Sequence, residues 1–515
     1  MEPTVQTLVI VLYLVTLGVL ALYGVHRSAL LFLYLRHRRE RTAPRSRFNE
    51  ADLPIVTIQL PMFNEMFVVE RLIDATARID YPNDRLEIQV LDDSTDATST
   101  LARTKCDALR EEGLDVAYLH REDREGYKAG ALEAGMKRAK GEFVLVFDAD
   151  FVPAPSVVRD LIHFFEDPSV AMAQARWAHL NRERSLLTQC QAMLLDGHFV
   201  IEHTARHRSG RFFNFNGTAG MWRKAAIADA GGWQHDTITE DMDLSYRAQL
   251  AGWKLIYAPH VSAPAELPCD MNSFKGQQYR WAKGSAQTAR KLLGQILGAE
   301  VGGKVKTEGF FHLTNNLAYV FLLVLAALQL PNMMMRRQME HPELLMLELP
   351  LFLATCGSVA AFYVVAHHDL YGGYWRAIKR LPVMMALGIG LSINNGRAVV
   401  EGLFGRDVEF VRTPKRGDVD HEPPPGAHGY RGRWPWHNTV ELAFGLYCTV
   451  TLVIAIATGS WASVPFLLLF CAGFTYVGVA SLLEAFRLER GQGNSELMAQ
   501  PPSTHSSPSP QSMLS

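Results

Sequence analysis

The sequence predicts an α/β domain with a mostly parallel sheet, inserted between membrane-spanning helices. Long apolar runs lie near both ends of the 515-residue chain, whereas the middle is mixed and charged like a soluble protein. In that middle, short β-rich runs alternate with amphipathic stretches, which is typical of a sheet flanked by helices. We expect about five spans, together with interfacial helices. A formal net charge of −2 provides no overall field that would recruit nucleic acid.

The first apolar run, residues 5–25, is long enough to cross a hydrocarbon core of about 30 Å. Basic residues follow this run between Arg36 and Arg47. A secretory signal peptide would instead carry its basic residues before the apolar run. We therefore expect an uncleaved anchor, and the positive-inside rule places the residues that follow it in the cytoplasm.

Four more segments that could span the membrane follow the soluble middle, at residues 313–330, 344–366, 440–458 and 461–483. A fifth apolar patch, residues 381–404, carries Asn394, Asn395, Arg397 and Glu401, which are costly at bilayer depth. If this patch spanned, the basic loop at 406–433 would face outside. We favour an interfacial or re-entrant helix, which keeps that loop inside and gives five spans. The Ser- and Pro-rich residues after Arg490 are expected to be disordered.

Four strands are expected in the soluble middle, at residues 55–60, 86–91, 116–119 and 143–147, with helices at 65–77, up to 109, and at 129–139. In parallel sheets, ligands bind at the carboxyl ends of the strands. Polar sequences follow three of these ends: PMFNE the first, DDSTD the second and DAD the fourth. Neither GxGxxG nor GxxxxGK[ST] occurs at the first strand, which argues against a dinucleotide fingerprint and a P-loop.

Four carboxylates gather at two of these strand ends: Asp92 and Asp93 after the second strand, Asp148 and Asp150 after the fourth. They would repel one another unless a cation lay between them. Oxygen ligands of this kind suit Mg²⁺ or Mn²⁺, which also hold substrate phosphates. For Asp92 and Asp93 alone, a turn or helix cap is an equally good interpretation. Fewer structural roles exist for two acids at the end of a buried strand.

Two further motifs carry candidate chemistry. Thr239 could cap the helix that begins after it, while Asp241 could accept a proton from an attacking hydroxyl group. The sequence QQYRW supplies an amide at Gln277, a guanidinium at Arg280 and a stacking face at Trp281. On its own, QQYRW could also be an anchor at the membrane interface.

Taken together and in this order, DDSTD, DAD, TED and QQYRW resemble the processive, inverting glycosyltransferases of family two, the cellulose-synthase superfamily. The stretches QLPMFNE, GYKAGALEAGMK and FNFNGTAGMWR are most similar to the cellulose-synthase-like A and C branches, which make glucomannan and glucan backbones and have bacterial relatives. The resemblance covers roughly residues 54–415. It implies the GT-A fold, a Rossmann-like α/β domain with a mostly parallel sheet.

The resemblance implies an enzyme that transfers a hexose from UDP-glucose or GDP-mannose, with inversion, onto a growing β-linked polysaccharide, coupled to export. The alternative is transfer of a single sugar to a membrane lipid such as ceramide or diacylglycerol. A transporter or sugar-nucleotide sensor is disfavoured because all the acidic motifs are intact. The expected partners are the nucleotide sugar, a glycan or lipid acceptor and the membrane, without nucleic acid.

The resemblance also implies the roles of individual residues. These are Asp92 or Asp93 for the nucleotide, Asp148 and Asp150 for Mg²⁺ or Mn²⁺, Lys128 for the donor, Asn216 and Gly217 within 213–218 for the acceptor, Asp241 of Thr239-Glu240-Asp241 as general base, and Gln277, Arg280 and Trp281 for the glycan terminus and the diphosphate. The aromatic residues between Phe212 and Phe215 would stack on acceptor sugars. A mobile loop, FxVTxK, is matched by Phe410, Thr413 and Lys415, with Arg412 at the valine position.

The expected organisation follows from these assignments: an anchor at 1–35, the catalytic domain at 48–300, interfacial and membrane helices at 301–404, the loop at 405–436, a membrane hairpin at 437–484 and a tail at 485–515. The catalytic domain is expected on the cytoplasmic side of a bacterial inner membrane, or of a eukaryotic Golgi or plasma membrane.

Overall fold

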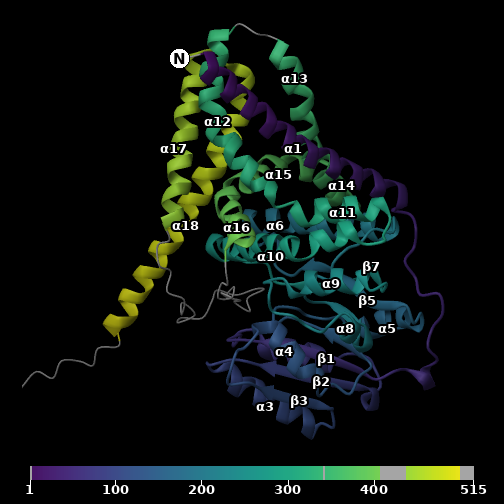
Figure 1. Ribbon diagram of the computed structural model, residues 1–515. Coiled ribbons are helices and arrows are strands. Elements are labelled where there is room, and N and C mark those ends of the chain that lie inside the picture. Colours follow the sequence, from purple (N-terminus) through teal and green to yellow (C-terminus); the bar gives the residue numbers. More distant parts are fainter. Residues whose placement is uncertain (1–2, 340–342, 406–435, 499–515) are drawn as a thin grey trace, which may run out of the picture.

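The computed structural model describes residues 3–339, 343–405 and 436–498. Phe410, Thr413 and Lys415, the residues of the expected mobile loop, lie outside these ranges. Figure 1 shows the sheet with its flanking helices at one end of the molecule and the long apolar helices at the other. Helices α10 (Met271–Gly298) and α11 (Gly303–Thr314) lie between the two parts.

The sheet has seven strands in the order β3-β2-β1-β4-β6-β5-β7. Their bounds are β1 Val56–Met62, β2 Leu86–Asp92, β3 Val116–His120, β4 Phe143–Val146, β5 Val170–His179, β6 Gly220–Arg223 and β7 Lys254–Ala265. Strand β6 runs antiparallel to both of its neighbours, β4 and β5, whereas the other neighbouring pairs are parallel. The prediction of a mostly parallel sheet is confirmed.

The central strands are hydrophobic because helices cover both faces of the sheet. All seven residues of β1 and all seven of β2 are buried. Parallel strands covered in this way read as continuous apolar runs rather than alternating ones. The helices that follow them are α2 (Val69–Ala77), α3 (Thr98–Glu111), α4 (Tyr127–Met136) and α5 (Val157–Ile162). Two buried amides at the same register are joined by one bond of 3.0 Å, from Gln59 Nε2 to Gln89 Oε1.

Two helical segments connect the sheet to the membrane part. Helix α6 (Leu186–Asp196) continues through a π-helical turn, η5 (Gly197–His203), into α7 (Thr204–Arg208). Gly197 is required at the start of this turn, because a Cβ there would lie 2.6 Å from the ring of Tyr363. Between β6 and β7 lie α8 (Lys224–Asp229) and α9 (Glu240–Leu250).

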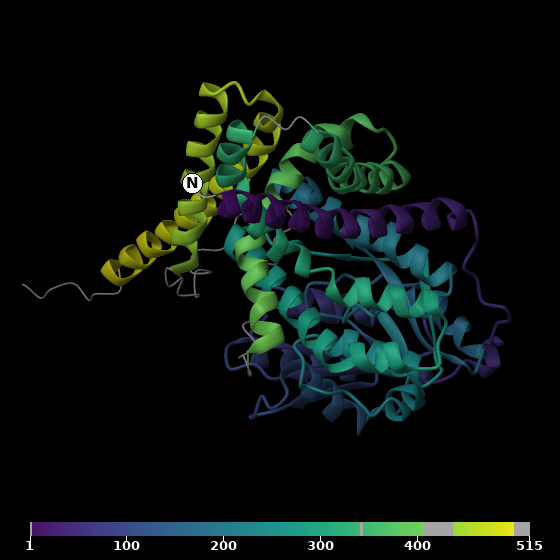
Figure 2. The ribbon, with the colours of Figure 1, turned by 45° about the horizontal axis from the view of Figure 1, so that its top comes forward.

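Five helices of the described residues are long and apolar enough to cross a membrane: Thr4–His37, Leu317–Arg336, Glu348–Tyr371, Asn438–Ala457 and Trp461–Phe486. They belong to α1 (Pro3–His37), α12 (Leu317–Met339), the series α13 (Glu343–Phe352), η6 (Leu353–Gly357) and α14 (Ser358–Tyr371), α17 (Trp436–Ala457) and α18 (Val464–Met498). The five expected spans are thus confirmed. Figure 2 shows α1 running along the part that contains the sheet and toward the other apolar helices. Helix α18 continues to Met498, beyond residue 485, where we expected the tail to begin.

The apolar patch at 381–404 forms a bent pair of helices, α15 (Trp375–Gly390) and α16 (Ser392–Phe404), with an angle of 44° between them. Counted as one broken span, the pair raises the number of spans to six. Polar residues of α16 form hydrogen bonds with α10. Asn394 Nδ2 donates to the carbonyl oxygen of Lys275 at 2.9 Å, and the Tyr279 hydroxyl group donates to Glu401. Arg397 Nε adds a bond of 2.6 Å to Glu401. Asn394 is buried, and Arg397 and Glu401 pair with each other, which makes these polar groups tolerable there.

Candidate active site

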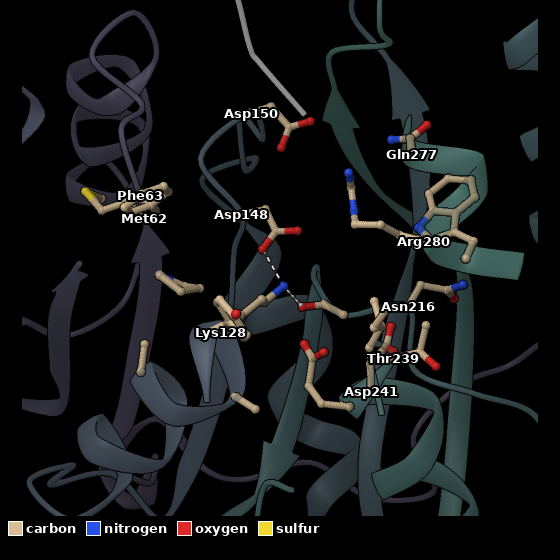
Figure 3. A pocket seen from close by; sticks show the side chains of 18 of the residues that line it. Met62, Phe63, Lys128, Asp148, Asp150, Asn216, Thr239, Asp241, Gln277 and Arg280 are labelled. Atoms are coloured by element: carbon tan, nitrogen blue, oxygen red, sulfur yellow. Dashed lines mark hydrogen bonds and ion pairs between the residues drawn. The ribbon is translucent and has the colours of Figure 1, made fainter. Parts of the chain in front are cut away.

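A cavity of about 540 Å³ lies at the carboxyl ends of the central strands. Its walls include Met62, Phe63 and Glu65 after β1, Asp93 after β2, Lys128 of α4, Asp148 and Asp150 after β4, Asn216 and Gly217 before β6, Thr239, Glu240 and Asp241 at α9, and Gln277, Arg280 and Trp281 of α10. Figure 3 shows Lys128, Asp148 and Asp241 around one space, with Arg280 reaching toward it from α10. The structure thus brings most of the predicted site residues together.

Lys128 lies at the centre of the acidic cluster (Figure 3). Its Nζ is 2.5 Å from Asp148 Oδ1 and donates to the carbonyl oxygen of Gly217 at 2.8 Å. Burial alone would lower the pKa of the lysine, but Asp148 and Glu240 hold it above its usual value. The backbone NH of Asp148 is fixed by Thr218 Oγ1 at 2.9 Å. Lys128 therefore remains charged and balances several carboxylates.

Asp148 and Asp150 fit the divalent cation predicted from the sequence. Both line the cavity, and Arg280 points toward them in Figure 3. Two carboxylates are a typical protein contribution to an Mg²⁺ or Mn²⁺ site that is completed by water and substrate phosphates. Within the described ranges, no group of three or more His, Cys, Asp and Glu side chains could hold a metal by itself. A divalent cation at Asp148 and Asp150 therefore stays a prediction.

The two acids after β2 differ in position. Asp92 does not line the cavity: its carboxylate accepts from Ser94 NH at 2.9 Å and from Tyr118 hydroxyl at 2.6 Å. Burial raises its pKa, but the hydrogen bonds outweigh burial and hold the pKa below its usual value. Asp93 does line the cavity, and Arg121 holds it with two bonds of 2.8 and 2.5 Å. Of the two interpretations open for this pair, a structural turn describes Asp92, and a ligand contact suits Asp93.

Asp241 lies in the first turn of α9, deep in the cavity. Burial and the neighbouring Glu240 raise its pKa to about 8, although Lys128 opposes this shift. Burial also raises the pKa of Glu240. Gly217 makes room for the carboxylate of Asp241, since a Cβ at Gly217 would lie 3.0 Å from Asp241 Oδ2. Its φ of +79° also favours glycine.

Thr239 precedes α9 but makes no side-chain cap hydrogen bond, so the cap predicted for it is wrong. Its Oγ1 lies 3.3 Å from Thr288 Oγ1 of α10 instead. The reason is close packing between α9 and α10, because a Cβ at Gly284 would lie 2.4 Å from the methyl group of Thr239. Thr239 therefore joins the helix that carries Asp241 to the helix that carries QQYRW.

Gln277, Arg280 and Trp281 all reach the cavity from α10. Burial lowers the pKa of Arg280 to about 10, while Asp148 acts in the opposite direction, so the guanidinium stays charged at neutral pH. The ring of Trp281 lies 6.4 Å from that of Trp177, centroid to centroid. QQYRW therefore does more than anchor the chain at the membrane, because it forms one wall of the cavity.

Asn216 also lines the cavity, and two histidines of the π-helical turn hold its amide. Asn216 Nδ2 lies 2.9 Å from His198 Nε2, and its Oδ1 lies 2.5 Å from His203 Nε2. The predicted stacking of acceptor sugars on Phe213 and Phe215 is wrong, since these rings are 1% and 0% exposed and pack in the core. Of this stretch, Asn216 and not the two phenylalanines reaches the cavity.

A chain of polar contacts runs from Asn216 to the first membrane helix. His198 Nδ1 lies 2.9 Å from Glu202, whose carboxylate also accepts from Arg206 at 3.1 Å. Arg206 then donates to Glu308 of α11 at 2.9 Å. Glu308 in turn lies 3.1 Å from His26 Nε2 on α1. The side of the cavity that carries Asn216 is therefore tied to the N-terminal helix.

The sequence analysis missed several residues of the cavity wall. Arg124 lies over the ring of Phe63, 3.4 Å from its centroid, and 5.1 Å from that of Tyr127. Backbone strain also marks the site: Asn64, Tyr127 and Ala219 are the non-glycine residues with positive φ in the described ranges, and all are in or beside the wall. The polar loop PMFNE was the available signal for Phe63, but contacts between distant loops cannot be read from a sequence.

Comparison with known proteins identifies the chain. The model for "Glycosyltransferase like family 2" matches residues 54–284. The Arabidopsis thaliana protein "Glucomannan 4-beta-mannosyltransferase 7" is 34% identical over 83% of this chain and 78% of its own length. The chain belongs to glycosyltransferase family 2. A second Arabidopsis family 2 relative, "Glucomannan 4-beta-mannosyltransferase 2", is 36% identical over 74% of this chain and 71% of its own.

A solved structure agrees with the fold expected for a family 2 enzyme. It is the mannosyltransferase from Pyrobaculum calidifontis in complex with GDP-Man and Mn²⁺, with a TM-score of 0.53 at 19% identity. The match covers 76% of this chain and 100% of that protein. Together with the five apolar helices, these findings show a multi-pass membrane glycosyltransferase of family 2. The predicted family and enzyme class are confirmed.

Proposed function

We propose that this enzyme transfers mannose from GDP-mannose, with inversion, onto a growing β-linked mannan or glucomannan. The convergence of Asp148, Asp150, Asp241 and Arg280 on one cavity carries this proposal. The choice of sugar rests on the similar plant proteins, which are named as glucomannan mannosyltransferases. The presence of GDP-mannose in the Pyrobaculum complex is consistent with it.

Each charged side chain has a role in this reaction. Asp241, in the first turn of α9, accepts the proton of the attacking acceptor hydroxyl group. The hydroxyl oxygen attacks the anomeric carbon on the side opposite the diphosphate, so that one displacement inverts an α-linked donor to a β-product. Arg280 and Lys128 stabilise the negative charge on the departing diphosphate. Asp93, held in place by Arg121, lies on the β2 side of the cavity, where it would contact the nucleotide.

Asp148 and Asp150 would hold Mg²⁺ or Mn²⁺ beside the diphosphate. A cation bound there supplies additional positive charge to the leaving group. Lys128 Nζ is 2.5 Å from Asp148 Oδ1 in this structure, so Asp148 would serve both the lysine and the cation. Arg280 completes the set of positive groups, which are fixed by their own helices before the donor binds.

A second cavity supports export of the product. It has a volume of about 480 Å³ and lies among the apolar helices, with Tyr13, Tyr23, Tyr319, Tyr363, Phe352, Phe466, Arg27, Asn315, Gln329 and Glu348 among its lining residues. Aromatic rings combined with polar groups suit a polysaccharide, which has apolar sugar faces and hydroxyl edges. Leu194 of α6 borders this cavity, while the next residue, Leu195, borders the active site. The catalytic domain would then face the cytoplasm, with the polymer leaving across the membrane.

The proposal is tested with the purified full-length protein in lipid nanodiscs. GDP-mannose and UDP-glucose are offered separately with Mg²⁺, Mn²⁺ or a chelator, and the product is analysed for linkage, anomeric configuration and length. We expect a β-linked mannan that requires the metal, and its loss in Asp148→Asn and Asp150→Asn but not in the surface variant Asp115→Asn. A single sugar attached to a lipid would favour the lipid glycosyltransferase instead. A polymer formed only from UDP-glucose would identify a glucan synthase.

A further inference from the structure

A buried histidine and aspartate form a pair in the wall of the active-site cavity that the reaction above does not use. His179 is the last residue of β5, and Asp196 is the last residue of α6. His179 Nε2 lies 3.0 Å from Asp196 Oδ1, and the two side chains are only 3% and 2% exposed. His179 nevertheless borders the cavity. Burying the carboxylate of Asp196 costs free energy. The position of its partner His179 in the cavity wall therefore needs an explanation.

The carboxylate of Asp196 determines which ring nitrogen can meet a ligand. In the neutral ring, the nitrogen that faces the carboxylate, Nε2, carries the hydrogen and donates a hydrogen bond to Asp196. The other nitrogen, Nδ1, is then a bare hydrogen-bond acceptor. No residue in the described part of the chain has a hydrogen bond to Nδ1. The pair therefore offers one acceptor atom of fixed orientation, which suits a hydroxyl donor.

The surroundings of His179 suit a sugar. Trp177 lies two residues earlier on β5, so its side chain projects from the same face of the strand. Its ring lies 6.4 Å from Trp281 of QQYRW, and both tryptophans border the active-site cavity. Apolar ring faces next to one fixed polar atom are the usual composition of a selective ligand pocket.

The position of the pair relates it to the acceptor rather than to the donor. Asp196 follows Leu194 and Leu195, the residues through which α6 borders the bundle cavity and the active site respectively. The acids assigned to the nucleotide and the metal, Asp93 and Asp148, follow β2 and β4 instead. A glycan extending from Trp281 toward the bundle passes this part of α6.

We propose that His179, oriented by Asp196, accepts a hydrogen bond from a hydroxyl group of the acceptor glycan beside Trp177 and Trp281. This inference rests on the proposed function, because it takes the acceptor to be a polysaccharide. His179 is then a binding residue for the acceptor and contributes nothing to the hydrolysis of the donor by water.

The test separates transfer from hydrolysis in the full-length enzyme. His179→Phe and His179→Gln are compared with wild type, and His260→Phe serves as the matched control, since His260 is a histidine of β7 outside the cavity wall. Initial rates are measured with β-linked mannooligosaccharides as added acceptors, and donor hydrolysis is measured without acceptor.

For His179→Phe we expect the KM for the oligosaccharide to rise about tenfold, the size of effect that a lost hydrogen bond produces. Hydrolysis of GDP-mannose should stay within twofold of wild type, and His179→Gln should recover part of the acceptor affinity. An unchanged KM, or a parallel loss of transfer and hydrolysis, would overturn this inference alone. A wild-type enzyme that extends no mannooligosaccharide but uses another acceptor class would overturn the proposed function as well.

Discussion

At the scale of single residues, the charge of the site is set by which carboxylates are buried and what lies beside them. Asp92 is held ionised by hydrogen bonds from Ser94 and Tyr118. Asp241 lies in the same domain but faces the opposite situation, because burial and Glu240 both favour its protonated form. The two aspartates thus illustrate how position decides function for one residue type.

The first prediction concerns pH. The pKa of Asp241 is raised to about 8, so in the free enzyme this carboxyl group is mostly protonated at neutral pH and cannot accept a proton. Its basic form increases as the pH rises through this value. We therefore expect kcat/KM to rise between pH 6.5 and 8.5, by about tenfold per unit below the pKa. Initial rates of nucleotide release check this, and a rate that decreases with rising pH over this range would exclude Asp241 as the base.

A second prediction is that Asp241→Asn abolishes transfer but not donor binding. The amide keeps the shape of the side chain but cannot accept the proton, which should reduce kcat by roughly 10²- to 10⁴-fold. Binding of GDP, measured by calorimetry, should change little, since Arg280 and Lys128 are retained. Equal losses of binding and turnover would show that Asp241 acts on the donor instead.

A third prediction concerns the room that Gly217 leaves for Asp241. In Gly217→Ala the new Cβ would lie 3.0 Å from Asp241 Oδ2, at a backbone φ of +79°. Displacing a catalytic group by even about 1 Å can cost about 10² in rate. Gly113→Ala is the matched control, because its φ is +89° but nothing lies within 4 Å of the added Cβ. We expect both variants to lose some stability, and only Gly217→Ala to lose most of its kcat.

At the scale of elements, one buried ion pair and several hydrogen bonds fix α10 to the membrane helices. Lys275 Nζ lies 2.6 Å from Glu441 of α17 and 2.8 Å from Asn438 Oδ1. Two backbone NH groups at the start of α10 donate to Glu484 of α18, at 2.7 and 3.0 Å. QQYRW follows directly on this helix. Its position in the cavity therefore depends on helices that lie far away in the sequence.

A fourth prediction follows from this attachment. Lys275→Met leaves Glu441 buried without its charged partner. Breaking such a pair typically lowers the free energy of unfolding by about 3–5 kcal/mol. Lys140→Met is the control, because its pair with Asp115 is exposed, at 58% and 42%, and should be worth about 1 kcal/mol or less. Thermal unfolding of the protein in detergent compares the two. Similar melting temperatures would mean that the Lys275 pair does not hold α10 in place.

The elements also show where sequence reasoning succeeds. The four expected strands and the loops after them were found within two residues, because buried parallel strands have a strong apolar pattern. The placement of Phe213 and Phe215 was wrong because the alternation of a short stretch does not tell which side faces the core. The His179–Asp196 pair was not predicted at all, since its residues belong to separate elements and form no local motif.

At the scale of the whole molecule, all five spans could be predicted, because hydropathy is a local property of the chain. What the sequence did not provide is the way these helices enclose a cavity beside the active site. That arrangement depends on contacts between α1, α12, α14 and α18, which combine residues from both ends of the chain.

The fifth prediction tests this cavity. Gly388 lines it, and a Cβ added there meets nothing within 4 Å, so Gly388→Leu should narrow the cavity without disturbing the fold. We expect shorter products with unchanged hydrolysis of the donor, measured by size-exclusion chromatography of the glycan. Gly18→Leu is the control, since it is equally open but does not line the cavity. Products of full length from Gly388→Leu would place the exit elsewhere.

The contact between His26 and Glu308 has a practical consequence for anyone who wishes to work with a smaller fragment. Deleting α1 would remove His26, the last residue in the series of polar contacts that runs from Asn216 through Arg206 and Glu308. Glu308, only 3% exposed, would then face detergent or water on a newly opened side. A truncated, water-soluble version of this transferase should therefore misplace its acceptor, and biochemical screens ought to begin with the intact polypeptide.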